Sequence, residues 1–357
     1  MATELERRFL ADLKSDWLDD IWIEDYTEGT CEWILHSREF ENWLRLSESD
    51  PILWIEGAPG TGKTVLAKFV YRQLYEIVSS DVSPPITKKI QWASAISKDH
   101  PVSFQVLAYF LDSGNSVRNR GLSVLQSLLH QVLSTDQKFF RYIHGKQLFR
   151  QPERGDFGQY MELLSAVFQN TSLSGTVIVL DALDECEEAS RSLLIQSLKA
   201  IASQPKVKVL VTSRSIPEVK IEPSIKINLD YPNEHVDRDI NSYVTTVVKD
   251  LARERRLPVQ LETEITSKLL KFPSKSFLWV QLALQSIAKA LTLRVLRNKL
   301  DRLTPSLSDL YSDLLDGPHG LRTINLRRAL YFVMIAEEPL QIQELSALLA
   351  ISQTWDS

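Results

Sequence analysis

Three of the twelve glycines in this 357-residue chain lie within six residues of one another, at positions 57, 60 and 62. The segment Gly57–Thr64 reads G-A-P-G-T-G-K-T and fits the pattern G-x-x-x-x-G-K-[ST] at every fixed position. It follows the apolar run Ile52–Ile55 and precedes a helical pattern, which is the strand–loop–helix context that this pattern requires. Glycines let backbone N–H groups curl around a phosphate, and the positive end of the following helix faces the anion. The sequence therefore predicts a phosphate-binding loop.

This loop indicates a purine nucleotide as the ligand. Lys63 would reach the β- and γ-phosphates, and the Thr64 hydroxyl would hold Mg²⁺. Chance would produce the pattern in about 1% of chains of this length, and the strand–loop–helix context lowers that fraction further. The residues expected to contact the nucleotide are Gly57, Ala58, Pro59, Gly60, Thr61, Gly62, Lys63, Thr64 and Val65. ATP and GTP both stay open, because base contacts come from loops without a readable code.

A loop of this kind needs an acidic partner for Mg²⁺ on a neighbouring strand. The apolar run Val177–Leu180 ends at Asp181, which we expect to bind the metal together with Thr64. Asp184 and Glu185 follow at once, and a carboxylate in that position could polarise an attacking water. Alternatively, these two residues only begin the next helix, where negative charge suits the helix dipole. Both interpretations stay open.

A candidate residue for contact with the γ-phosphate follows another strand. The run Val207–Thr212 is followed by Ser213 and Arg214. An arginine there could contact the γ-phosphate and report its presence, since guanidinium groups bind phosphate oxygens strongly. The alternative is an ordinary arginine in a turn. We therefore place Arg214 with Asp184 and Glu185 among the candidate catalytic residues.

Hydrophobic periodicity predicts alternating strands and helices over the first two thirds of the chain. Strands are expected at 52–55, near 104–111, at 177–180, at 207–212 and near 225–229, and helices at 30–46, at about 63–78 and around 125–133. Continuous apolar strands between amphipathic helices are typical of an α/β fold, with a parallel sheet covered by helices on both faces. The segment 88–96 could be a further strand, without a place in the sheet. After about residue 231 the pattern is helical only.

Composition and charge exclude several function classes. The chain has 41 basic and 46 acidic residues, a net charge of −5, so it lacks the basic excess of a nucleic-acid-binding protein. Its two cysteines cannot build a disulfide framework and fit a reduced, cytoplasmic setting. The N-terminus is charged from residue 4, unlike a signal peptide, and no run of 18 apolar residues exists. We therefore expect neither nucleic acid nor a membrane as a partner.

Together these motifs resemble the NACHT family of the STAND class of signal-transducing P-loop NTPases, and within it the fungal set related to heterokaryon-incompatibility proteins. The segments that carry the resemblance are Trp54–Thr64, Leu180–Cys186, Val211–Arg214, Gly29–Trp33, Phe277–Val280, Pro339–Leu340 and Glu344–Leu345. The arrangement D-[small]-x-D-E, formed by Asp181, Ala182, Asp184 and Glu185, is its most specific element. The likeness covers roughly residues 25–350.

The resemblance implies a P-loop NTPase sheet in which the strand before Arg214 lies between the strand before the loop and the strand that ends at Asp181. It also implies four segments: a helical lead-in at 1–50, the nucleotide-binding domain at 51–230, a helical domain at 231–320 and the beginning of a winged-helix domain at 321–357. We expect the chain to be a fragment without its C-terminal repeat domain, or to depend on sensor and effector partners that the sequence does not name. Such proteins rest with a diphosphate bound, exchange it on a signal and form homo-oligomers.

Three functions stay open from the sequence. The first is a signalling switch that slowly hydrolyses ATP or GTP with Mg²⁺. The second is a nucleotide-gated scaffold that does not hydrolyse its ligand. The third is a metabolic P-loop kinase, which is disfavoured because the helical region extends for over 100 residues and no substrate lid is evident. Turnover separates the first two functions, and phosphate transfer to an acceptor other than water would indicate the third.

Overall fold

The computed structural model describes residues 4–13, 26–44, 50–79, 104–135, 138–145, 156–169, 175–204, 206–222, 225–272, 276–290, 292–304, 306–316, 324–336 and 340–353. The chain forms two compact units, Met1–Ser242 and Tyr243–Ser357. The possible strand at 88–96 lies outside the described residues. The domain boundaries expected at residues 50, 230 and 320 stay predictions.

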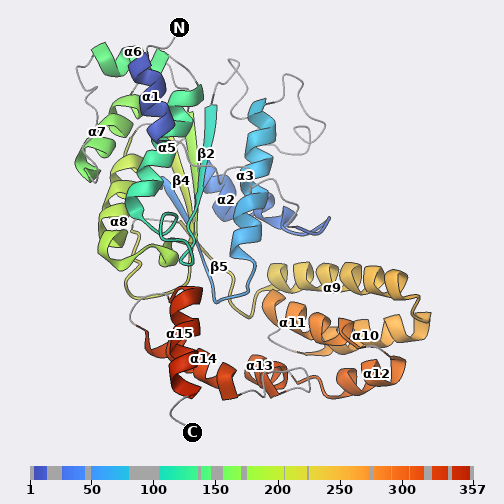
Figure 1. The fold of residues 1–357 in the computed structure, drawn as a ribbon. Coiled ribbons are helices and arrows are strands. Elements are labelled where there is room, and N and C mark those ends of the chain that lie inside the picture. The colour runs from blue at the N-terminus through green and yellow to red at the C-terminus, as the bar shows by residue number, and fades with distance from the viewer. Residues whose placement is uncertain are drawn as a thin grey trace. The chain divides into compact units, whose positions relative to one another are not determined.

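A parallel sheet forms the centre of the first unit (Figure 1). In the described residues its strands are β1 (Ile52–Glu56), β2 (Phe104–Phe110), β3 (Gly175–Asp181), β4 (Val207–Ser213) and β5 (Ile225–Asn228). Their order is β2-β3-β4-β1-β5, and each neighbouring pair is parallel. Every residue of β3 and β4 is buried, as in a sheet that is covered on both faces. The predicted parallel sheet is confirmed, and so is the place of β4 between β1 and β3.

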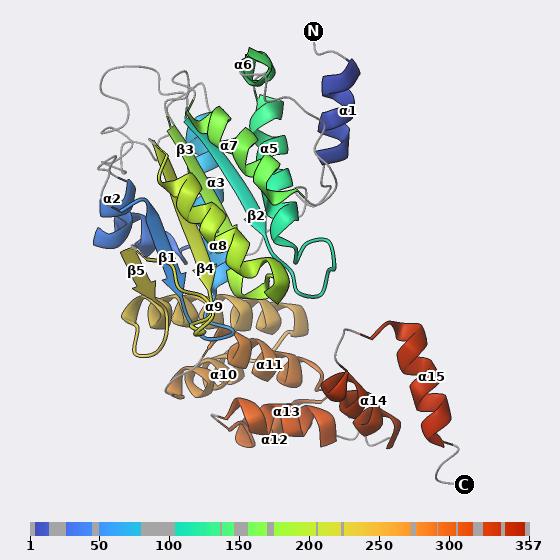
Figure 2. The same ribbon diagram turned by 90° about the vertical axis from the view of Figure 1, so that its left-hand side faces the viewer.

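Helices cover both faces of this sheet. The helices α5 (Gly121–Thr135), α7 (Phe157–Phe168) and α8 (Glu188–Ala202) lie on one face, and α3 (Lys63–Ser79) lies on the other (Figures 1 and 2). The shorter helix α2 (Arg38–Leu44) packs against β1 and β5. At the periphery, α1 (Glu4–Leu13) contacts α5, and α6 (Lys138–Gly145) contacts α7 and α5. The helices predicted at about 63–78 and around 125–133 are confirmed.

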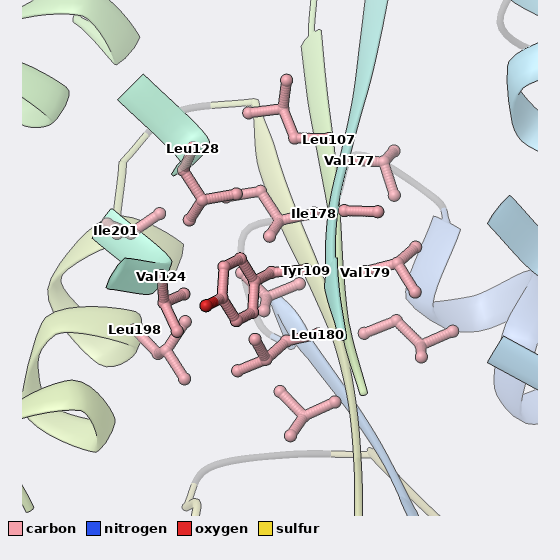
Figure 3. Packing of buried hydrophobic residues seen from close by; sticks show 14 of the residues in the cluster. Leu107, Tyr109, Val124, Leu128, Val177, Ile178, Val179, Leu180, Leu198 and Ile201 are labelled. Carbon is pink, nitrogen blue, oxygen red and sulfur yellow. The ribbon is translucent and has the colours of Figure 1, made fainter. Parts of the chain in front are cut away.

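Side chains of the strands alternate between two apolar layers. In Figure 3, Ile178 and Leu180 of β3 point toward α5 and α8, whereas Val177 and Val179 point to the opposite side. The residues that surround them on the α5–α8 side include Leu107, Tyr109, Val124, Leu128, Leu198 and Ile201. All of these side chains are buried, and each such burial stabilises the fold by about 1.5–3 kcal/mol. The strands are therefore fixed in register by apolar contacts on both faces.

The single helix predicted at 30–46 is wrong in one respect, because it is broken at Ser37. A 3-10 helix, η2 (Glu32–His36), precedes Ser37, and α2 follows it. Ser37 has an extended backbone (φ −72°, ψ 142°), and its hydroxyl accepts a hydrogen bond from the Phe40 N–H at 3.2 Å. Serine favours such a capping position over a helix interior. The apolar face that was expected nevertheless exists, since Phe40, Trp43 and Leu44 are buried.

In its described residues, the second unit is built from helices alone, as predicted after residue 231. They are the last turns of α9 (Glu234–Arg255), then α10 (Val259–Lys271), α11 (Phe277–Ala288), α12 (Leu293–Asp301), α13 (Leu307–Asp316), α14 (Ile324–Ile335) and α15 (Ile342–Gln353). The apolar stripes of α9 and α11 supply buried core residues, which include Val244, Val248, Trp279, Val280, Leu284 and Ile287. The helices α14 and α15 pack against each other. The winged-helix domain expected from residue 321 stays a prediction.

Candidate functional site

The glycine-rich segment Gly57–Thr64 joins the end of β1 to the first turn of α3. Gly60 and Gly62 have φ angles of 78° and 93°, in the left-handed region that residues with a Cβ rarely adopt. The Leu66 N–H donates to the Gly62 carbonyl at 2.9 Å, which begins the helix. The N–H groups of the first helical turn have no acceptor within the helix and point out of its N-terminal end. The loop therefore has the backbone geometry that an anion site needs.

The side chain of Lys63 folds back along this loop. Its Nζ donates to the carbonyl oxygens of Gly57 at 2.6 Å and Ala58 at 2.8 Å. Burial lowers the pKa of the Lys63 ammonium, and the negative charges of Asp184 and Asp181 oppose that shift. Two carbonyls and two carboxylates thus hold a single positive charge beside the loop. A phosphate group that enters the loop would find this charge in place.

The nine residues predicted to contact a nucleotide differ in their exposure. Ala58, Pro59 and Thr64 are exposed, Gly57 is buried, and the half-buried ones are Gly60, Thr61, Gly62, Lys63 and Val65. The hydroxyl of Thr61 donates to the Ala58 carbonyl at 2.9 Å and so closes the loop on itself. The Thr64 side chain, by contrast, is open to solvent. Thr64 is thus accessible in the first turn of α3.

Asp181 is the last residue of β3 and is only 2% exposed. Its Oδ1 accepts a hydrogen bond of 2.5 Å from the hydroxyl of Thr212, and Thr64 forms a second side-chain hydrogen bond with it. Burial raises the pKa of Asp181, while these two hydrogen bonds and the charge of Lys63 oppose the shift. Asp181 and Thr64, predicted from separate motifs as a metal-binding pair, therefore meet directly.

The acidic residues that follow β3 lie in a short 3-10 turn, η3 (Leu183–Glu185). Ala182 enters the turn with a left-handed backbone (φ 57°), and its N–H donates to the Thr212 hydroxyl at 2.9 Å. Arg191 of α8 fastens the other side, because its guanidinium donates to the carbonyls of Cys186 and Asp184. Strand β4 and helix α8 thus hold this turn between them.

Asp184 and Glu185 point to different partners. Asp184 forms an ion pair with Arg214, in which Oδ2 lies 3.1 Å from the arginine Nε. Glu185 instead accepts two hydrogen bonds at Oε2 from Ser113, at 2.9 Å from the backbone N–H and 3.2 Å from the hydroxyl. The three candidate catalytic residues are therefore neighbours, but they do not form one cluster of contacts.

Sequence reasoning missed Ser113, Asp230 and Arg191. Asp230 follows β5, and its Oδ1 accepts a hydrogen bond of 2.6 Å from the Ala58 N–H in the loop. Ser113 follows β2, the neighbour of β3 in the sheet. In a parallel sheet the loops after the strands gather at one edge, so a polar residue shortly after any strand is a candidate. That signal was present in the sequence, but the strand order was needed to use it.

These residues fit a nucleotide with Mg²⁺. Magnesium in such sites is bound by one or two carboxylates together with phosphate oxygens and water, so Asp181 and Thr64 suffice on the protein side. Among the described residues, no group of three or more histidine, cysteine, aspartate or glutamate side chains is arranged to hold a metal by itself. None of the described helices is both long enough and apolar enough to cross a bilayer.

One known protein family matches most of the first unit. The family described as "Nephrocystin 3, N-terminal" matches residues 29–214, just over half of the chain. The matched region begins at Gly29 and ends at Arg214, and so contains the loop, Asp181 and the acidic turn.

One curated protein and one solved structure are also similar to this chain. The vegetative incompatibility protein HET-E-1 of Podospora anserina is 23% identical over 329 residues, which are 88% of this chain and 22% of the relative. The chain thus spans about a fifth of the length of this curated relative. A solved structure, PCH-2 of C. elegans, overlaps 80% of this chain and 71% of its own, with a TM-score of 0.42 and 13% identity.

Proposed function

Because the chain belongs to the nephrocystin 3 N-terminal family and is NACHT-like, we propose that it is a nucleotide-binding signalling switch. It binds ATP or GTP with Mg²⁺ through residues 57–65 and hydrolyses the triphosphate slowly. Exchange of the diphosphate for the triphosphate shifts the chain toward a homo-oligomer. Both cysteines are free and buried, which suits a reduced cytoplasmic setting.

The observation that carries this proposal is the contact of Thr64 with Asp181. The two residues come from different motifs, 117 positions apart in the sequence, and the sheet order brings their side chains together. A hydroxyl and a carboxylate at the mouth of a glycine-rich loop suit Mg²⁺ held on a nucleotide phosphate. A purely structural loop would need neither.

Each polar residue then has a distinct part in nucleotide binding. Asp181 and Thr64 would hold Mg²⁺, which would supply positive charge beside the phosphates. Lys63 adds a cation from the loop side, and Arg214 reaches the γ-phosphate from the end of β4. The acidic turn supports hydrolysis, through a carboxylate that orients or polarises a water.

A scaffold that binds nucleotide without hydrolysing it is the second candidate. The specific observation in its favour is that both acidic residues of the turn are engaged, Asp184 by Arg214 and Glu185 by Ser113. A carboxylate that already accepts hydrogen bonds polarises water less effectively. Release of phosphate from a radiolabelled triphosphate at a rate above that of Asp181→Asn would favour the hydrolytic switch.

Nucleotide binding itself is tested by Lys63→Ala. This variant removes the side-chain cation that reaches the loop, and we expect its affinity for Mg²⁺–nucleotide to fall by about tenfold or more, since charged hydrogen bonds are worth about 1.5–3 kcal/mol. Titration calorimetry with ATP, ADP, GTP and GDP measures the affinity. The matched control is Lys199→Ala, which removes an exposed lysine of α8. If folded Lys63→Ala binds as tightly as the control, the proposed site is wrong.

A further inference from the structure

A single arginine occupies both oxygens of Asp184. Oδ1 accepts a hydrogen bond of 2.9 Å from the backbone N–H of Arg214, and Oδ2 lies 3.1 Å from its side-chain Nε. The Asp184 side chain is 7% exposed, whereas the Arg214 side chain is 51% exposed. The carboxylate is therefore the buried anchor of the pair, and the arginine is the part that extends toward solvent.

This geometry fixes one end of the guanidinium and leaves its other end open. Nε is held by Asp184, and within the part of the chain that the structure describes Nη1 and Nη2 have no hydrogen-bond partner. These two nitrogens form the planar fork with which arginine binds phosphate oxygens. Asp184 also fixes the backbone of Arg214, so both the origin and the direction of the side chain are set by one carboxylate.

The turn that carries Asp184 is rigid enough for this task. The Ala182 N–H is held by the Thr212 hydroxyl of β4, and the Asp184 carbonyl accepts from Arg191 of α8. Arg214 itself directly follows β4. Both members of the pair are thus attached to neighbouring strands, β3 and β4, whose register is fixed.

We propose that Asp184 is a positioning residue, which orients Arg214 toward the γ-phosphate and takes no part in polarising water. The inference rests on the proposed function. It assigns the two acidic residues of the turn different tasks: Asp184 orients Arg214, and Glu185 faces the water. Each Asp184 oxygen already has a contact with Arg214 and the side chain is 7% exposed, so Asp184 is the less accessible acceptor for a water. Glu185 keeps one oxygen, Oε1, without a hydrogen-bond partner among the described residues, and it is the carboxylate left for water.

The test compares discrimination between triphosphate and diphosphate. Calorimetry with Mg²⁺ gives the affinities of wild type, Asp184→Ala, Asp184→Asn, Arg214→Ala and the double variant Asp184→Ala/Arg214→Ala. The probes are the β,γ-imido analogues of ATP and GTP, with ADP and GDP as diphosphates. The matched control is Asp250→Ala, which removes the carboxylate of the exposed Asp250–Arg253 pair, also 3.1 Å long.

We expect Arg214→Ala to lower the triphosphate-to-diphosphate affinity ratio by about tenfold or more. Asp184→Ala should lower the same ratio by about 3-fold or more, and Asp184→Asn by less, because the amide oxygen still accepts from the Arg214 N–H. The double variant should be no worse than Arg214→Ala, since the aspartate acts through the arginine. A merely structural role would lower both affinities together and leave the ratio unchanged.

The outcomes separate this inference from the proposed function. If wild type binds and discriminates the nucleotides but Asp184→Ala and Asp184→Asn keep the full ratio, the inference is wrong and the switch stands. If the double variant loses the product of the two single losses, Asp184 acts independently of Arg214, which also overturns it. If wild type binds none of the four probes, the proposed function fails. Asp184→Asn, which is nearly isosteric, supplies the answer where thermal unfolding shows that Asp184→Ala is not folded.

Discussion

At the scale of single residues, Asp181 combines opposing electrostatic effects. Its carboxyl is almost fully buried, and burial raises its pKa because the charged form is desolvated. Hydrogen bonds from Thr212 and Thr64 and the charge of Lys63 oppose this shift. A metal ion bound at this carboxylate would add positive charge to that of Lys63. The charged form of Asp181 would therefore be better compensated with a metal ion bound than without one.

Asp181→Asn tests this balance. The amide retains an oxygen that can accept from Thr212 but loses the negative charge, so we expect weaker Mg²⁺-dependent nucleotide binding and unchanged or higher thermal stability. Nucleotide affinity is measured with Mg²⁺ and again with EDTA in both samples. The difference between variant and wild type should shrink in EDTA. An equal loss under both conditions would show that Asp181 does not act through the metal.

At the scale of elements, the segment before β1 is fastened to the first turns of α9. Oδ2 of Asp239 accepts hydrogen bonds from the Cys31 N–H at 2.9 Å and from Nε1 of Trp33 at 3.0 Å. The Trp33 ring also stacks on His235, with ring centres 4.6 Å apart. Cys31 has a left-handed backbone (φ 68°), which this contact helps to hold. The Gly29–Trp33 motif thus has a structural task in the first unit.

The Asp239 contact predicts a pH dependence of stability. Burial raises the pKa of Asp239, and the bonds from Cys31 and Trp33 and the charges of His235 and Arg238 oppose this. A raised pKa means that the folded state binds the proton more tightly. The protonated Asp239 carboxyl therefore stabilises the folded state at low pH. This stabilisation is lost as the pH rises from the ordinary carboxyl pKa, about 3.9, through the raised pKa of the folded state.

We expect the stability of Asp239→Asn not to fall through this titration as the pH rises. Near neutral pH the variant should be at least as stable as wild type. Asp239→Ala should be less stable by about 1–3 kcal/mol, because the Cys31 N–H and the Trp33 ring lose their acceptor. Denaturant unfolding across pH 4–8 measures both. His235→Phe replaces the stacked imidazole by an uncharged aromatic ring and is the control variant. An identical pH profile in wild type and Asp239→Asn would contradict the prediction.

Elements and contacts differ in how far the sequence could predict them. The strands β1, β3 and β4 were predictable because continuous apolar runs bounded by polar residues have few alternatives. The break at Ser37 was not, because the same apolar spacing suits one helix or two, and a capping hydrogen bond decided it. The loop residues Lys63 and Thr64 were predicted from the spacing of the motif alone. The contacts of Ser113 and Asp230 depend on which strands are neighbours in the sheet. The resemblance to a known family implied the order of β1, β4 and β3, but not the places of β2 and β5.

At the scale of the whole molecule, all the candidate nucleotide-binding and catalytic residues fall in the first of two units. The family match ends at Arg214, well before the unit ends at Ser242. In the proposed switch, a contact of Arg214 with the γ-phosphate would have to be converted into a change of assembly. A ligand shifts such an equilibrium only by its differential affinity for the two states. The size of the Arg214 contribution sets the size of the shift.

That limit gives a quantitative prediction for oligomerisation. If only the assembly-competent conformation of a chain places Arg214 on the γ-phosphate, a contact worth about tenfold moves that chain's own conformational equilibrium from 1:99 to roughly 1:10, whereas complete conversion to 99:1 needs about 10⁴-fold. We therefore expect wild type with Mg²⁺ and a diphosphate to be mostly monomeric, and the oligomer fraction to be larger with a β,γ-imido triphosphate.

Sedimentation velocity at one fixed protein concentration measures both fractions. Lys63→Ala should respond to neither nucleotide, because it binds both weakly, and Arg214→Ala should give the same distribution with both. The two variants separate binding from discrimination, since only the first loses the ligand itself. Equal distributions of wild type with both nucleotides, at concentrations that saturate binding, would contradict the switch.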